Sequence, residues 1–224
     1  ITTKELDKLV YEIAAAYTGS HHDYSRLASS VAISSYHKET NESFSQTMMV
    51  LYGDGIINDK LIETIKLYGE DTIDAVINHD NDYNFDYFAW RSLQEMYLLK
   101  RPNGVTVERP QHMYMRIALW VTESFVDAVE YYKSLSNQLI SKATPIMINS
   151  GTKVPQLASC VLHYNNSDSR KGLLDTLTDI STFSSDAAGI GLSMSNIRSK
   201  ESRISSSGGY AGGLLKYLKI VNES

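Results

Sequence analysis

The apolar residues of this chain follow one spacing as far as residue 140 and another after it. Up to that point they recur every three or four residues, which is the period of an amphipathic helix. Beyond it, short apolar runs bounded by Gly, Pro and polar residues alternate with a further helical pattern, as in strand–helix–strand units. The sequence predicts an α+β to α/β fold, in which a helical region precedes a partly parallel α/β region and the boundary lies near residue 140.

The helical region divides into successive helices. Thr2 and Glu5 have the spacing of a capping box, which begins a helix. The apolar positions after it mark one face: Leu6, Leu9, Val10 and Ile13. The second helix is expected at residues 23–39 and is expected to bury Leu27, Val31 and Ile33. Further helices are expected at residues 44–52, 60–68, 71–77, 110–121 and 124–140.

An aromatic-rich stretch lies between residues 85 and 99 and is expected to face the core. The positions concerned are Phe85, Phe88, Leu93, Met96 and Tyr97. The polar run at residues 79–84 is expected to be a loop or the start of the next helix.

The second half contains three candidate strands, at residues 143–149, 157–163 and 189–195. A helix is expected between the last two, at residues 171–185. The Ser- and Gly-rich residues 205–213 predict a flexible loop before an apolar helix.

Composition excludes several classes of protein. The formal net charge is −5, and no basic block is present, so a nucleic-acid polymer is not an expected partner. No apolar run is long enough for a transmembrane helix, so no membrane association is expected. The histidines lack metal-ligand spacing, and the single Cys160 excludes a multi-cysteine site within these residues, so no metal is expected. One cysteine also fits a reducing compartment such as the cytoplasm.

Cys160 has two interpretations. A lone cysteine inside an apolar run is commonly a small buried hydrophobe, whereas the functional alternative is a redox thiol or a nucleophile. His163 lies three positions further on, and residues three apart on a strand face opposite sides, so His163 is a poor base for Cys160. If Cys160 is redox-active, its partner must lie outside these residues. The glycine-containing segments at 187–191 and 205–213 match neither a Walker A motif nor a dinucleotide fingerprint.

Several strings resemble the large, catalytic subunit of class I ribonucleotide reductase, of the eukaryotic and large-virus type. They occur in the order of that family: TTKELD at 2–7, HKET at 37–40, YLLK at 97–100, ERPQHM at 108–113, ATPIMINSGT at 143–152, PQLASC at 155–160 and AAGIGLSMSNIR at 187–198. The resemblance implies radical reduction of ribonucleoside diphosphates to deoxyribonucleoside diphosphates in a ten-stranded α/β barrel. It implies the C-terminal helices of an ATP-cone-like module at 1–40, a helical N-terminal domain at 41–140, and the first barrel strands and helices at 141–224.

The resemblance also implies roles for individual residues. Cys160 corresponds to one of two active-site thiols that form a disulfide as the ribose is reduced. Residues expected at the substrate are Thr144, Ser159, Ala188 and Gly189. Residues expected at a deoxynucleotide effector are Asp168, Ser169, Arg170, Arg198, Ser205 and Ser206. In this group Asp168 would receive the ribose hydroxyl and Arg198 the phosphate. Residues expected at the adenine nucleotide of the ATP-cone are Thr3, Asp7 and Lys38.

The same resemblance implies partners. No cofactor is expected to bind directly, because the radical comes from a metal-containing small subunit, and the nucleotide effectors are ATP and deoxynucleoside triphosphates. A thioredoxin- or glutaredoxin-type reductant, a large-subunit dimer and a C-terminal part of the large subunit beyond Ser224 are also expected, as is a segment before Ile1. Two alternatives stay open at this stage: a non-catalytic nucleotide-binding regulatory or assembly module, and a structural remnant in which Cys160 is a packed thiol.

Overall fold

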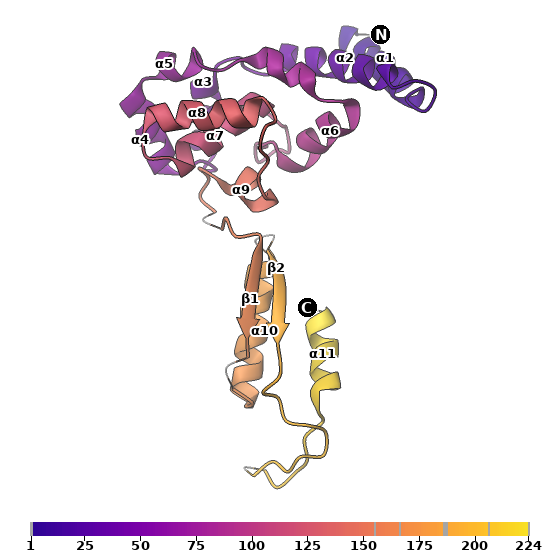
Figure 1. The fold of residues 1–224 in the computed structure, drawn as a ribbon, viewed down its shortest axis with the longest axis vertical. Coiled ribbons are helices and arrows are strands. Elements are labelled where there is room, and N and C mark those ends of the chain that lie inside the picture. Colours follow the sequence, from indigo (N-terminus) through magenta and orange to yellow (C-terminus); the bar gives the residue numbers. More distant parts are fainter. Residues whose placement is uncertain (1, 155, 166, 186–187, 206, 224) are drawn as a thin grey trace. The chain divides into compact units, whose positions relative to one another are not determined.

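The computed structural model describes residues 2–154, 156–165, 167–185, 188–205 and 207–223. The chain forms two compact units, residues 1–155 and residues 156–224 (Figure 1). The first unit is helical, whereas the second combines a parallel strand pair with helices. Both fold classes were expected from the change in apolar spacing.

The first unit contains, in chain order, α1 (Thr3–Ala16), α2 (Asp23–Glu39), α3 (Phe44–Gly53), α4 (Asp59–Tyr68), α5 (Glu70–Asp74), the 3-10 helix η1 (His79–Asn84), α6 (Tyr87–Ser92), the π-helical turn η2 (Leu93–Tyr97), α7 (Pro110–Val121), α8 (Phe125–Ser136) and α9 (Thr144–Asn149). The second unit contains β1 (Cys160–Tyr164), α10 (Arg170–Ser185), β2 (Gly189–Ser193) and α11 (Leu214–Glu223).

The capping box of α1 is present as expected, because the Thr2 amide donates to Glu5 Oε2 at 2.7 Å and the Glu5 amide donates to Thr2 Oγ1 at 3.2 Å. The apolar face that follows is not buried. About half of each of its side chains is exposed, at 52% for Leu6, 52% for Leu9, 41% for Val10 and 51% for Ile13. Leu27 of α2 is 49% exposed, so its expected burial is wrong. The expected burial of Ile33 is confirmed, and Val31 is half-buried. The other buried apolar residues of the two helices are Ala14, Ala28, Ala32 and Tyr36.

The aromatic stretch is only partly in the core. Phe85 and Leu93 are buried, whereas Phe88 is 80% exposed and Met96 is 63% exposed, so the expectation is wrong for those two. The reason is that the stretch is not one regular helix. Phe85 precedes α6, and η2 has the wider turn of a π-helix, so a constant 3.6-residue period does not hold from Phe85 to Met96.

Helix α7 forms the centre of the first unit. Pro110 stands in its first turn, where a missing N–H costs no hydrogen bond, and every residue from Pro110 to Leu119 is buried. The helix contacts α4, α8, α9 and η1. A helix that is buried on all faces must satisfy its polar side chains with partners inside the protein.

Glu108 and Arg116 form the ion pair at this centre, and both side chains are fully buried. Arg116 Nε donates to Glu108 Oε1 at 2.6 Å and Arg116 Nη2 donates to Glu108 Oε2 at 3.0 Å. Glu108 Oε2 also accepts the Leu99 amide at 3.0 Å. The rest of the guanidinium binds carbonyl oxygens around α9, with Arg116 Nη2 donating to Met147 O at 3.0 Å and Nη1 to Ser150 O.

The segment at 143–149 is therefore a helix, α9, and the expected strand is wrong. Pro145 lacks the N–H that a central strand needs but suits the first turn of a helix. Because Arg116 binds the end of α9, and Ile57 forms an antiparallel bridge with Thr152, residues 141–155 belong to the helical unit. The division at residue 155 replaces the one expected near residue 140.

In the second unit β1 and β2 pair in parallel, with Cys160 opposite Gly189 and Tyr164 opposite Ser193. Helix α10 connects them, and this is the expected strand–helix–strand order. The first strand begins at Cys160 and not at Leu157. Tyr217 of α11 donates its hydroxyl to Leu173 O at 2.6 Å, which ties α11 to α10. In the part of the chain that the structure describes, no helix has the length and apolar character needed to cross a membrane.

The Arg116→Met variant is expected to lose about 3–5 kcal/mol of unfolding free energy, because it leaves the buried Glu108 carboxylate without its counter-charge. Arg91→Met is the matched control, since the Arg91–Glu95 pair is largely exposed and its loss is expected to change stability by less than about 1 kcal/mol. Chemical denaturation of both variants measures the difference. Equal losses would contradict a central role for the buried pair.

Candidate functional site

Cys160 is the first residue of β1, and its side chain is exposed in this part of the protein. Gly189 stands opposite it in the strand register. A Cβ at Gly189 would lie 3.9 Å from Cys160 Sγ and 3.6 Å from Ser159 O. Glycine at this position thus keeps the space beside the thiol open on one side. The structure places Gly189 beside Ser159 and Cys160, and these are three of the residues that the family resemblance implies at a substrate.

The backbone at Ala188 and Gly189 is already hydrogen-bonded. The Ala188 amide donates to Phe183 O at 3.1 Å, and the Gly189 amide donates to Ser159 O at 2.8 Å. A ligand near these residues would therefore meet the glycine surface and not two unused N–H groups. Thr144, the remaining substrate candidate, belongs to the first unit, where its hydroxyl lies 3.4 Å from that of Tyr97.

His163 does not act on Cys160. Along β1 the exposure alternates, with Cys160 exposed and His163 half-buried on the other face of the strand. His163 Nε2 instead lies 3.5 Å from Asp179 Oδ2 of α10. The described residues of this unit therefore give the thiol no histidine base, as the strand geometry predicts.

A second feature is a cavity of about 480 Å³ at the ends of the two strands. Asp168 follows β1 and Arg198 follows β2, and the carboxyl ends of parallel strands meet at one edge of a sheet. The predicted effector residues Asp168, Ser169, Arg170, Arg198 and Ser205 all line this cavity. Ser206 lies outside the described residues. The remaining lining residues are Leu173, Ile197, Ile204, Ser207, Ala211, Gly212, Gly213 and Tyr217.

Asp168 and Arg198 bind each other across the cavity wall. Arg198 Nε donates to Asp168 Oδ2 at 2.5 Å, Arg198 Nη2 donates to Asp168 O at 2.9 Å, and the Arg198 amide donates to Asp168 Oδ2 at 3.2 Å. The pair holds the segments after the two strands together. It also supplies adjacent negative and positive groups, which suit a ligand with both hydroxyl and phosphate groups.

The expected flexible loop has a defined hairpin-like structure in its described residues. The Ile204 amide donates to Gly209 O and the Ala211 amide donates to Ser202 O, each at 2.8 Å. Gly213 ends this loop with φ of +77°, and a Cβ there would lie about 3.0 Å from the backbone of Lys200. Glycine at this position therefore lets the loop close against the segment after β2.

Sequence reasoning missed the apolar part of the cavity, most clearly Tyr217. This residue comes from α11, some distance along the chain from the strand ends. The apolar pattern of residues 214–221 indicated only that this helix packs against something. Which surface it covers depends on the tertiary fold, and no local spacing carries that information.

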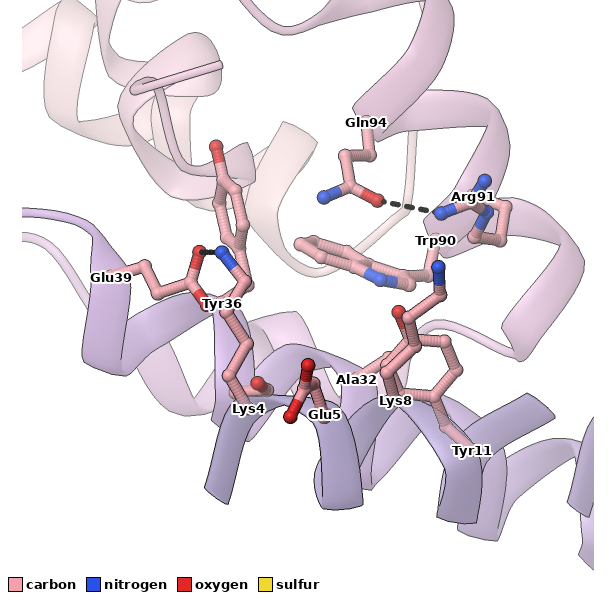
Figure 2. Close-up of a pocket in the computed structure, with 11 residues that line it drawn as sticks. Lys4, Glu5, Lys8, Tyr11, Ala32, Tyr36, Glu39, Trp90, Arg91 and Gln94 are labelled. Atoms are coloured by element: carbon pink, nitrogen blue, oxygen red, sulfur yellow. Dashed lines mark hydrogen bonds and ion pairs between the residues drawn. The ribbon is translucent and has the colours of Figure 1, made fainter. Parts of the chain in front are cut away.

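Two of the three residues expected at an adenine nucleotide connect α1 and α2, because Lys38 Nζ lies 3.0 Å from Asp7 Oδ2. The third, Thr3, is exposed in the first turn of α1. A neighbouring hollow of about 280 Å³ opens between α1, α2, α6 and η2, as Figure 2 shows. Trp90 and Tyr36 line it, together with the Lys4–Glu39 ion pair of 2.8 Å. None of Thr3, Asp7 and Lys38 lines this hollow.

Two family models match adjacent parts of the chain. The ribonucleotide reductase all-alpha domain matches residues 83–155, and the ribonucleotide reductase barrel domain matches residues 158–224. The junction between the two matches coincides with the division between the two compact units. A helical unit followed by the opening βαβ of a barrel is thus the architecture that both the fold and the matches define. The chain belongs to the family of ribonucleotide reductase large subunits.

Individual relatives agree with this assignment. The whole chain aligns with the ribonucleoside-diphosphate reductase large subunit of variola virus at 38% identity and with that of Arabidopsis thaliana at 37% identity. It aligns with ribonucleoside-diphosphate reductase large chain 2 of Saccharomyces cerevisiae at 36% identity. The chain spans 30%, 28% and 27% of the length of these three relatives, respectively.

The Gly213→Ala variant is expected to lose about 1–2 kcal/mol of local stability, because alanine is strained at φ of +77° and its Cβ meets the Lys200 backbone. Hydrogen exchange of residues 198–213 is expected to accelerate. Gly209→Ala is the matched control in the same loop, since its Cβ would meet only Ser207 Oγ at 3.6 Å and its φ is not in the left-handed region. Similar exchange in both variants would contradict the closed loop.

Proposed function

We propose that this chain is the N-terminal part of the large subunit of a ribonucleoside-diphosphate reductase, which reduces ribonucleoside diphosphates to deoxyribonucleoside diphosphates for DNA synthesis. The observation that carries the proposal is the exposed thiol of Cys160 opposite Gly189, in the region that matches the barrel domain. An exposed thiol beside an open backbone surface is accessible to a substrate.

In the proposed reaction Cys160 supplies half of a dithiol. The C2′–OH bond of the ribose breaks and a C–H bond takes its place, while two thiols become a disulfide and the hydroxyl leaves as water. The second thiol comes from a part of the large subunit outside residues 1–224, since Cys160 is the only cysteine here. A metal-containing small subunit supplies the radical that starts the reaction. A thioredoxin- or glutaredoxin-type protein reduces the disulfide again, which assigns the enzyme to a reducing compartment such as the cytoplasm.

Substrate binding is assigned to the surroundings of that thiol. Ser159 and Gly189 are adjacent to Cys160 in the strand pair, and Ala188 precedes Gly189. Thr144 is proposed to bind the diphosphate with its hydroxyl, because a short hydroxyl binds phosphate without filling the space that the ribose needs.

The cavity at the strand ends is proposed to bind a deoxynucleoside triphosphate effector. Asp168 would accept the ribose hydroxyl and Arg198 would pair with phosphate, with Ser169, Arg170, Ser205 and Ser206 around them. The volume of about 480 Å³ falls within the range of small-molecule sites. Binding of the effector in this cavity would influence which substrate is reduced, through the loop that follows β2. The large subunit is also proposed to function as a dimer. Thr3, Asp7 and Lys38 are proposed to contact an adenine nucleotide at the ATP-cone.

The second candidate function is a non-catalytic module that binds nucleotides and regulates or assembles the enzyme. The effector cavity alone would favour it, because binding a nucleotide needs no thiol. The exposed Cys160 favours the catalytic proposal. The state of this cysteine after turnover separates the two.

Peptide mapping of the full-length protein after turnover without external reductant is expected to find Cys160 in a disulfide with a cysteine outside residues 1–224. Added dithiol is expected to return it to the free thiol. In the near-isosteric Cys160→Ser variant, nucleotide reduction is expected to fall at least about 1000-fold while nucleotide binding persists, because only the electron donor is removed. A Cys160 that stays reduced throughout, or turnover in the serine variant, would contradict the redox assignment.

Arg198→Ala is expected to weaken binding of a deoxynucleoside triphosphate about 10–100-fold, since it removes a charge-assisted contact to phosphate and the support of Asp168. Arg203→Ala is the matched control, because Arg203 is exposed on the same loop and does not line the cavity. Equilibrium dialysis with labelled nucleotide measures both. Equal affinities in the two variants would remove the cavity as the effector site.

A further inference from the structure

Two histidines and an aspartate from distant parts of the chain meet in the first unit. His37 lies near the end of α2, whereas His79 and Asp82 lie in η1. One ring nitrogen of each histidine and one carboxylate oxygen all lie within 4.8 Å of one another. The spacing of these residues in the sequence gave no sign of a metal site, because the histidines are more than forty positions apart. Nothing in the proposed reductase chemistry uses them.

The hydrogen bonding of His79 leaves one ring nitrogen available as a ligand. His79 Nε2 lies 2.9 Å from Glu42 O, and a carbonyl only accepts, so Nε2 carries the hydrogen. With the hydrogen on Nε2, His79 Nδ1 has a lone pair, and among the described residues this buried atom has no hydrogen-bond partner. Histidines that bind metals are commonly oriented in this way, with the other ring N–H bound to a backbone carbonyl.

His37 and Asp82 supply the other two ligands. His37 Nε2 lies 2.8 Å from Asp82 Oδ2, at hydrogen-bond distance. A tetrahedral ion with bonds of about 2.1 Å holds neighbouring ligand atoms about 3.4 Å apart, so a shift of about 0.6 Å between the two side chains would admit the ion. Asp82 is fully buried, and its Oδ1 accepts from Gln111 Nε2 at 3.0 Å. Gln111 is itself held by Tyr132 and Ser136. The carboxylate is thus positioned by an outer set of hydrogen bonds, which leaves Oδ2 directed at His37.

Arg109 and a third imidazole, that of His112, also lie next to this cluster. The Arg109 guanidinium donates to His37 O and Thr40 O at 2.9 and 2.8 Å. The positive charge of Arg109 disfavours the binding of a cation nearby, and its hydrogen bonds to the two carbonyl oxygens partly compensate that charge. The His112 ring packs against that of His79, with 5.1 Å between centroids, and its Nε2 also lies near Glu42 O, at 3.1 Å. His112 Nδ1 is likewise buried, with no hydrogen-bond partner in the described part of the chain.

We propose that His37, His79 and Asp82 form a binding site for a divalent cation of the zinc type. Two imidazoles and one carboxylate are a ligand set that zinc accepts, with water in the remaining position. The ion would join α2 to η1 and so fix the two-helix α1–α2 element to the rest of the helical unit. The site serves structure and not the reduction of ribose, so it stands independently of the proposed function.

The exposed group His21, His22 and Asp23 provides a comparison within the same chain. Its donor atoms also lie within 4.8 Å of one another, but its members are consecutive and exposed. It lacks the buried unpartnered nitrogen and the buried carboxylate of the proposed site. It therefore represents adventitious surface binding in the experiment.

The experiment titrates Co²⁺, as a spectroscopic probe for zinc, into the chelator-treated full-length large subunit without its small subunit. His79→Gln retains an amide that can donate to Glu42 O but removes the imidazole, and His22→Gln is the matched control. We expect the wild type with Co²⁺ to show visible ligand-field bands that added Zn²⁺ abolishes. His79→Gln is expected to lack these bands and to bind about one equivalent of Co²⁺ less than the wild type. His22→Gln is expected to keep both.

Equal binding and equal bands in the wild type and His79→Gln would overturn the proposal, as would the same loss in His22→Gln. A second measurement covers the case in which His79→Gln does not fold. In the wild type, Zn²⁺ is expected to slow acylation of His79 by diethyl pyrocarbonate, mapped by mass spectrometry, at least about tenfold more than that of His22. No such difference would show that the cluster is only a buried His–Asp hydrogen bond.

Discussion

The ion pair between Glu108 and Arg116 is the interaction on which the helical unit depends. Both side chains are fully buried, and the guanidinium reaches past the carboxylate to carbonyl oxygens at the end of α9. Removing two charges from water costs several kcal/mol per ion, so the pair is stable only because its hydrogen bonds are satisfied together. The arrangement therefore specifies one position for α9 on α7. It explains why the segment up to residue 155 folds with the helices and not with the strands.

The polar residues of the string ERPQHM have structural roles that the family resemblance does not reveal. It identified the family, yet its polar members are buried connections and not parts of the candidate active site. Arg109 binds the end of α2, Gln111 joins η1 to α8, and His112 lies near Glu42 O. Each partner lies at least about twenty residues away in the sequence, so these contacts depend on the tertiary fold. The buried polar residues of this string thus connect helices through hydrogen bonds.

Local patterns predicted the helices well where the apolar period was regular, as for α2 and α7, whose bounds agree with the expected ones. The patterns were wrong in two places where a local feature interrupts the regular period. Pro145 favours a helix, α9, where a strand was expected, and the π turn at η2 changes the face on which Met96 lies. The effector candidates Asp168 and Arg198 came from the family resemblance, and the parallel βαβ unit explains why two residues thirty positions apart meet at the ends of its strands. The exposure of Cys160 and the proximity of His37 to His79 could not be predicted from the sequence, because both depend on contacts between distant parts of the chain.

The two units are proposed to be the N-terminal part of a ribonucleoside-diphosphate reductase large subunit. The most direct measurement is conversion of CDP to dCDP by the native complex that contains this chain, with ATP, a dithiol reductant and the small subunit present. Turnover that requires all of these components is expected. Absence of turnover in a fully assembled complex that still binds nucleotides would contradict this proposal and would support the regulatory module.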